Sequence, residues 1–216
     1  LKKNLILVFL IGLILFLSTD WSPRPIQSFE DGMPLSGSIN FENNKLPWID
    51  VYLNSGFFYD MLNAKISWLI TGQKTIGSYI FYLEFLNFVA IILFIYFIYQ
   101  LSSQINLKNQ NNNFFIFVSI ISYIYLWNES IWRDIPLILF LIFSLNYLNN
   151  KSTNSILFLG FLSVFTFFWS LDRGFFVFLV YISFLIIVLI NNKKDFLKFI
   201  LTTILFWIIA ILFIGI

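Results

Sequence analysis

The feature that most constrains the fold of this chain is a series of long apolar runs with almost no charged residues. Such runs lie at about 5–18, 80–101, 114–132, 135–148, 156–171, 175–190 and 196–216. Each approaches the roughly 20 residues that a helix needs to cross the hydrocarbon core of a bilayer. They lack the alternation of barrel strands, since 90–95 reads AIILFI. The sequence therefore predicts an all-α, polytopic transmembrane bundle of about seven spans, in a single integral membrane domain over 1–216.

The composition excludes several classes of protein and of active site. Charged residues make up 11% of the chain, whereas soluble domains average about a quarter. The 13 Lys and Arg against 11 Asp and Glu, with no long basic run, exclude a nucleic-acid-binding protein. The chain has no Cys and no His, which excludes disulfides, thiolate chemistry, catalytic triads and His-ligated metals. Any catalysis must therefore use carboxylates, Lys, Arg, Tyr, hydroxyl groups or the backbone.

The basic residues are distributed unevenly among the loops between the predicted spans. With the N-terminus in the cytoplasm, the inner side carries seven Lys, whereas only Arg133 and Arg173 lie in the short outer loops. An excess of basic residues in short cytoplasmic loops is the usual arrangement in membrane proteins. We therefore predict a cytoplasmic N-terminus and a long outer loop at 19–79. Heavy use of Lys, Asn, Ile and Phe is typical of AT-rich coding and favours a bacterial inner membrane.

The outer loop contains one segment with helical periodicity, at 57–71. Apolar residues fall on one face, polar residues such as Asp60 and Asn63 on the other, and Gly72 follows as a C-cap. This pattern predicts an amphipathic helix that lies in the membrane interface. The same pattern also fits a helix packed on the outer ends of the spans. The Ser, Gly and Asn residues of 36–44 predict turns.

Charged residues gather at three outer positions: Glu30-Asp31, Arg133-Asp134 and Asp172-Arg173. Charges near the membrane plane are costly, so they need a partner or a function. A carboxylate close to an apolar boundary has a raised pKa and can act as a base, and Arg binds phosphate bidentately. We therefore predict Asp31 or Glu30 as catalytic base. Arg173, with Arg133, is predicted to bind the phosphate of a substrate.

Each cluster also has a structural interpretation. Asp134 stands just before Pro136, where it would begin a helix. Residues 172–174 fit a tight turn in which Gly supplies a positive φ, and 30–32 fit a solvated turn. Asp60 is predicted to be solvated or to cap a helix.

The order of these features resembles the GT-C superfamily of membrane glycosyltransferases. The shared order is one span, a long acidic outer loop, the segment 47–50 (PWID), an amphipathic helix ending in Gly, and many further spans. Residues 133–140 (RDIPLILF) are similar to the acidic residue that opens the fourth span of that family. Residues 169–174 (WSLDRG) resemble its basic loop facing the lipid phosphate.

The resemblance implies transfer of a sugar from a polyprenyl-phosphate-linked donor to an acceptor hydroxyl at the outer face of the membrane. It implies that a carboxylate of the first outer loop, Asp31 or Glu30 with Asp20 as a further candidate, is the base or a metal ligand. It implies substrate binding by Arg173, Asp172, Arg133 and Asp134. Metal use is left open, because the chain has no clear Asp-x-Asp. The superfamily has more spans, so we expect an N-terminal fragment or a short member.

Two other classes of function remain open. A transporter or flippase usually has charged or broken helices at mid-membrane and internal repeats, whereas Glu84 is here the only acid near a span interior. A non-catalytic assembly subunit is compatible with all of these features. The predicted partners are membrane lipids and the polyprenyl-phosphate sugar.

Overall fold

The computed structural model describes residues 2–17, 31–104, 114 and 131–214. Within these ranges the elements are helical, and strand pairing is limited to one isolated bridge between Pro47 and Val51. The elements are α1 (Lys2–Leu17), α2 (Gly32–Glu42), η1 (Phe58–Leu62), α3 (Asn63–Thr71), α4 (Ile76–Gln104), η2 (Ile131–Asp134), α6 (Ile135–Asn150), α7 (Thr153–Trp169), α8 (Leu171–Asn191) and α9 (Lys193–Ile214). The predicted all-α class is confirmed for this part of the chain.

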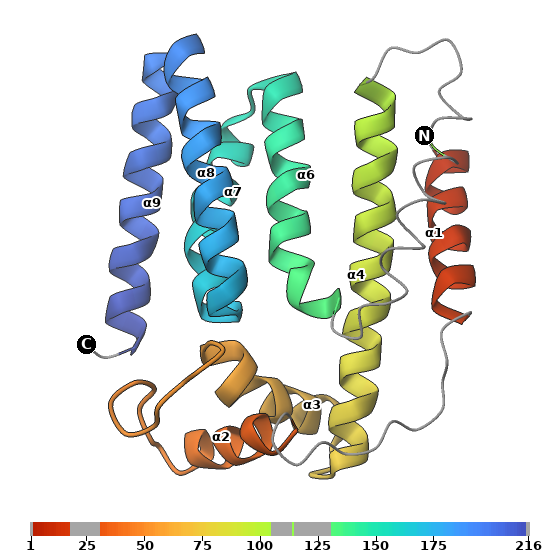
Figure 1. Cartoon of the computed structure of the whole chain (residues 1–216), viewed down its shortest axis with the longest axis vertical. Helices are drawn as coiled ribbons and strands as arrows, with labels where there is room; N and C mark the ends of the chain where they lie inside the picture. The colour runs from red at the N-terminus through yellow and green to blue at the C-terminus, as the bar shows by residue number, and fades with distance from the viewer. Residues whose placement is uncertain (1, 18–30, 105–113, 115–130, 215–216) are drawn as a thin grey trace.

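The long helices run alongside one another, and α2 and α3 lie across one end of the bundle (Figure 1). Helix α7 packs against α6, α8 and α9, while α1 packs on α4, which in turn contacts α6. We call the end that carries α2, η1 and α3 the loop end. The opposite end is called the lysine end, because Lys151 follows α6 there and Lys193 and Lys194 begin α9.

Among the described residues, four helices are long and apolar enough to cross a membrane. They are Ile76–Ser102, Ile131–Asn150, Leu171–Asn191 and Lys193–Leu212. The predicted runs at 5–18 and 156–171 form the shorter apolar helices Val8–Leu17 and Thr153–Trp169. The run at 114–132 lies almost wholly outside the described residues. A helical bundle with membrane-spanning helices is therefore supported, and the number of seven spans stays a prediction.

The stretch 36–44, predicted to form turns, is mostly helical, since α2 ends only at Glu42. The cause is tertiary packing of α2 on η1, which outweighs the weak helix propensity of Ser, Gly and Asn. Contact is close at Gly37, where a Cβ atom would lie 1.8 Å from the carbonyl oxygen of Asp60. The turn prediction is therefore wrong up to Glu42.

The helix predicted at 57–71 is present as η1 and α3, and Gly72 ends it in the left-handed region at φ 69° as expected. Its polar face is buried, however. Asp60 and Asn63 are 3% and 0% exposed, whereas Leu69 is 73% exposed. The segment packs on α2 and α4, while its position in the membrane interface stays a prediction. The alternative, a helix packed on the ends of the spans, describes the structure.

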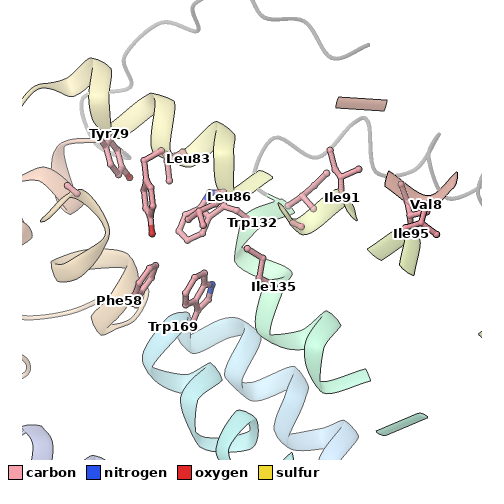
Figure 2. Packing of buried hydrophobic residues seen from close by; sticks show 14 of the residues in the cluster. Val8, Phe58, Tyr79, Leu83, Leu86, Ile91, Ile95, Trp132, Ile135 and Trp169 are labelled. Carbon is pink, nitrogen blue, oxygen red and sulfur yellow. The ribbon is translucent and has the colours of Figure 1, made fainter. Parts of the chain in front are cut away.

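An apolar core joins the loop end to the bundle. Figure 2 shows Leu86 of α4 and Trp132 of η2 close together, with Phe58 of η1 and Trp169 of α7 side by side. All of these side chains belong to one buried cluster, which also includes Ile135 at the start of α6. The cluster thereby joins η1 to the start of α6 and the end of α7. This packing positions the charged residues described next.

Candidate functional site

Two Arg and two Asp from separate segments meet at the loop end. Arg133 and Asp134 precede α6, and Asp172 and Arg173 lie in the first turn of α8. Arg133 Nη2 lies 2.8 Å from Asp172 Oδ1, and Arg173 Nε lies 2.5 Å from Asp134 Oδ1. We call these residues the arginine–aspartate cluster. The charges of Glu30-Asp31, Arg133-Asp134 and Asp172-Arg173 were expected to converge at one outer interface, and the structure brings the second and third of these pairs together.

Asp172 bridges the two Arg side chains. Its Oδ1 faces Arg133, and its Oδ2 lies 3.5 Å from Arg173 Nη1. Arg133 also donates from Nε and Nη2 to Ser170 Oγ, at 3.3 and 3.0 Å, and the Ser170 hydroxyl donates to Asp172. The Asp172 side chain is 43% exposed, against 9% for Asp134. The part of the cluster that faces outward is therefore the Asp172 carboxylate.

The segment 172–174 is not the tight turn that the sequence allowed. Only Ser170 separates α7 from α8, with an extended backbone at φ −160°. Gly174 is helical, and a Cβ atom there would lie 2.7 Å from the Phe167 ring. Gly174 is therefore needed because it allows α7 and α8 to approach closely, and not because its backbone adopts a positive φ. Asp172 in the first turn of α8 is also favoured by the helix dipole.

Asp134 does occupy the N-cap position of α6, and Pro136 follows within the first turn, as its sequence context indicated. Its side chain nevertheless makes no capping hydrogen bond. The carboxylate instead pairs with Arg173, and the pair lies largely out of solvent. A buried carboxylate depends strongly on such a partner. Asp134 is thus tied to α8 rather than to its own helix.

Aromatic rings form an apolar layer next to the cluster. The rings of Tyr59 and Trp132 are stacked at 5.4 Å, and the guanidinium carbon of Arg133 lies 5.0 Å from the Tyr59 centroid. The rings of Phe58 and Trp169 are stacked with 3.9 Å between their centroids, and Figure 2 shows the two side chains next to each other. The Arg133 guanidinium therefore has a ring face on one side and acceptor oxygens on another, an arrangement that the planar group favours.

Asp60 of η1 connects the loop end to the start of α8. Its Oδ2 accepts the N–H groups of Ser55 and Gly56, at 2.8 and 3.3 Å. The carbonyl of Ser55 in turn accepts the N–H of Leu171, at 2.7 Å. Burial raises the pKa of Asp60 above its usual range, although these N–H groups and the charge of Arg133 act to lower it. Asp60 is 3% exposed and therefore not solvated. It is also not the N-cap of η1, which is Phe57 and has no side-chain cap; the Asp60 carboxylate instead holds the two residues before that N-cap.

The residues predicted as catalytic base are only partly described. Asp31 precedes α2 and is 1% exposed, so its interpretation as part of a solvated turn is wrong. Glu30 and Asp20 lie outside the described residues. Helix α2 packs on η1, which carries Asp60. The role of Asp31 as base stays a prediction.

Sequence reasoning missed two polar neighbours of the cluster. Ser170 could have been suspected, because it lies two residues before Asp172 in the same short segment. The contact of Tyr59 with Arg133 had no sequence signal, since the two residues are far apart in the chain. Among the described residues, no three carboxylates gather in a way that could hold a metal ion.

No protein family, curated protein or solved structure matches the chain. What the cluster can do must therefore be inferred from its geometry. Two guanidinium groups are bridged by one exposed carboxylate, at the border between an apolar layer and solvent. The guanidinium group of Arg binds two oxygens of a phosphate as it binds two oxygens of a carboxylate, and a phosphate carries more negative charge than a carboxylate. The arrangement is suited to bind a phosphate group in place of Asp172.

Proposed function

We propose that this chain transfers a sugar from a polyprenyl-phosphate-linked donor to an acceptor hydroxyl, at the loop end of the bundle. In this proposal it is a GT-C-type enzyme of about seven spans, set in the bacterial inner membrane with a cytoplasmic N-terminus. The long loop 19–79 then lies on the outer side. One observation carries the proposal, namely the bridging of Arg133 and Arg173 by the exposed carboxylate of Asp172.

The donor phosphate would take the bridging position. Its oxygens would accept hydrogen bonds from Arg133 and Arg173, and the Asp172 side chain would turn toward solvent. Asp172 is the more exposed of the two Asp, so its contacts with Arg133 and Arg173 are the ones that the greater negative charge of a phosphate would replace. The polyprenyl chain would remain in the lipid beside the bundle, with its head at the aromatic layer. Membrane lipids and the lipid-linked sugar are thus the partners.

The transfer step needs a base and stabilisation of the leaving group. The acceptor oxygen forms a bond to the anomeric carbon as the bond from that carbon to the phosphate oxygen breaks. The phosphate leaves with the electron pair, and the two Arg stabilise its added charge. The acceptor proton passes to a carboxylate, for which Asp31, Glu30 and Asp20 are the candidates. A divalent metal is not required by this scheme.

The phosphate role can be tested with undecaprenyl phosphate and the chain in nanodiscs. We expect Arg133→Lys and Arg173→Lys to weaken binding about tenfold each, because the bidentate fork is lost. Asp172→Asn should strengthen binding, because it removes the competing charge. Lys198→Gln, which changes a charged residue at the lysine end, is the matched control and should leave binding unchanged. Equal binding by all variants would remove the phosphate role from the cluster.

The base is tested by sugar transfer from undecaprenyl-phosphate-linked donors. Asp31→Asn, Glu30→Gln or Asp20→Asn should abolish transfer while protein abundance and undecaprenyl phosphate binding persist. Normal transfer in all three variants would leave the reaction without any of its proposed bases.

A further inference from the structure

A pocket of 360 Å³ lies at the loop end. It is formed by the C-terminal end of α2, the turn 44–47, Phe57, and Lys65 of α3. None of the residues that line it belongs to the arginine–aspartate cluster. Its volume lies within the range of roughly 300–1,000 Å³ that is usual for sites of small ligands. The pocket is therefore a second candidate site, distinct from the first.

The charge of the pocket is positive. Two of its residues, Lys45 and Lys65, form no ion pair with any acidic side chain of the described residues. Its one carboxylate, Glu42, is paired with Lys74. A Lys ammonium is a compact, strongly hydrated charge that binds phosphate as a point charge. The lining is thus suited to an anion.

Aromatic side chains hold one of the two Lys in place. Lys65 Nζ lies 4.5 Å from the centroid of the Phe41 ring. Phe41 in turn packs edge-to-face on Phe57, with 5.6 Å between the ring centroids. Both rings line the pocket. The Lys65 ammonium is therefore positioned over a wall that is otherwise apolar.

The loop beside the pocket presents apolar side chains to its surroundings. Leu46 lines the pocket and is 43% exposed, and Ile49 and Tyr52 of the same loop are 58% and 85% exposed. The loop is held in shape by Asp50, whose Oδ2 accepts the Leu46 N–H at 2.9 Å. Exposed apolar side chains next to the ends of spanning helices are typical of contact with the lipid interface. They favour a ligand that has an apolar part.

We propose that this pocket binds the phosphate headgroup of an anionic membrane lipid. Lys45 and Lys65 contact the phosphate, and Leu46 and Ile49 contact the glycerol and the first part of the acyl chains. Lys side chains close to a membrane surface attract the negatively charged headgroups of anionic lipids. The proposal does not depend on glycosyl transfer at the arginine–aspartate cluster.

The experiment measures binding of dioctanoyl phosphatidylglycerol to the full chain in a neutral detergent, by calorimetry. Dioctanoyl phosphatidylcholine and glycerol 3-phosphate are the comparison ligands. We expect phosphatidylglycerol to bind at least tenfold more tightly than either, since it combines net negative charge with acyl chains. The double variant Lys45→Gln/Lys65→Gln should lose this preference. Lys65→Arg should keep it, and Lys198→Gln at the lysine end should be unaffected.

A further variant changes the charge of the pocket in the opposite direction. Glu42→Gln removes its one carboxylate and should tighten phosphatidylglycerol binding severalfold. Unchanged binding by the Lys45/Lys65 double variant overturns the proposal. If phosphatidylcholine bound as tightly as phosphatidylglycerol, the pocket would not recognise the negative charge of the headgroup. If glycerol 3-phosphate bound as tightly as phosphatidylglycerol, the ligand would be a free phosphate compound and not a lipid. Undecaprenyl phosphate binding by the same double variant should persist, which separates this proposal from the previous one.

Discussion

Two aspartates of the same cluster have different energetic roles because their exposure differs. Asp134 is largely buried against Arg173, and removing one partner of such a pair costs about 3–5 kcal/mol. Asp172 is far more exposed, so solvent weakens its pairs with the two Arg more than it weakens the pair of Asp134 and Arg173. Asp134 therefore holds Arg173 in position, and a ligand is not expected to displace the Asp134 carboxylate. Asp172 is the residue that a ligand can replace.

Asp60 makes a pH-dependent contribution that can be measured. Its pKa is raised by burial, so the folded chain binds a proton more readily than the unfolded chain does. Stability from this group is greatest at low pH and is lost as pH rises through the raised pKa. Asp60→Asn keeps an acceptor oxygen for Ser55 and Gly56 without the buried charge. We expect this variant to match or exceed the wild-type thermal midpoint at pH 7. Its midpoint should not show the decrease with rising pH that Asp60 causes in the wild type.

Asp60→Ala is the matched variant for that measurement. It removes the acceptor of two N–H groups, which should cost about 1–3 kcal/mol relative to Asp60→Asn, a difference that should not vary with pH because neither variant titrates at this position. A wild-type midpoint in detergent that rose with increasing pH, while that of Asp60→Asn stayed flat, would contradict a raised pKa for Asp60.

At the scale of elements, the docking of α2 on η1 depends on one glycine. A Cβ atom at Gly37 would lie 1.8 Å from the backbone oxygen of Asp60, and backbone cannot move aside as a flexible side chain can. We expect Gly37→Ala to cost about 1–3 kcal/mol or more, as overpacking does. The measurement is the thermal midpoint in detergent, combined with the rate of proteolysis within 32–42.

Gly32 provides the control, because it begins the same helix and a Cβ atom there meets nothing within 4 Å. Gly32→Ala should be neutral or stabilising by up to about 1 kcal/mol, since Ala favours a helix over Gly. Equal thermal midpoints for Gly37→Ala and Gly32→Ala would show that the close contact with η1 does not prevent a side chain at position 37.

For the whole molecule, the two ends of the bundle make its orientation testable. The chain has no Cys, so a single introduced thiol reports its own position. Tyr52→Cys lies at the exposed loop end and Lys194→Cys at the exposed lysine end. With Lys residues on the cytoplasmic side, a membrane-impermeant maleimide should label Tyr52→Cys in intact cells and Lys194→Cys only after permeabilisation. The reverse result would invert the orientation, and labelling of both in intact cells would contradict a spanning bundle.

The candidate site was partly predictable because its residues are charged and stand at the ends of apolar runs. That position alone implies a partner or a function, and it led to Arg133, Asp134, Asp172 and Arg173. Which Arg pairs with which Asp was not predictable. The pairing depends on how α6 and α8 are placed relative to each other, and this is set by packing rather than by either segment.

The sequence by itself determined the helical class and the approximate limits of the long helices. Long apolar runs must satisfy their backbone hydrogen bonds internally in a membrane, and only a helix does so within one segment. Only the tertiary structure decided that the polar face of 57–71 is buried and that Asp172 lies between two Arg. The physical reason is that a helical period defines the faces of a helix, whereas the element opposite each face is chosen by packing of the whole chain.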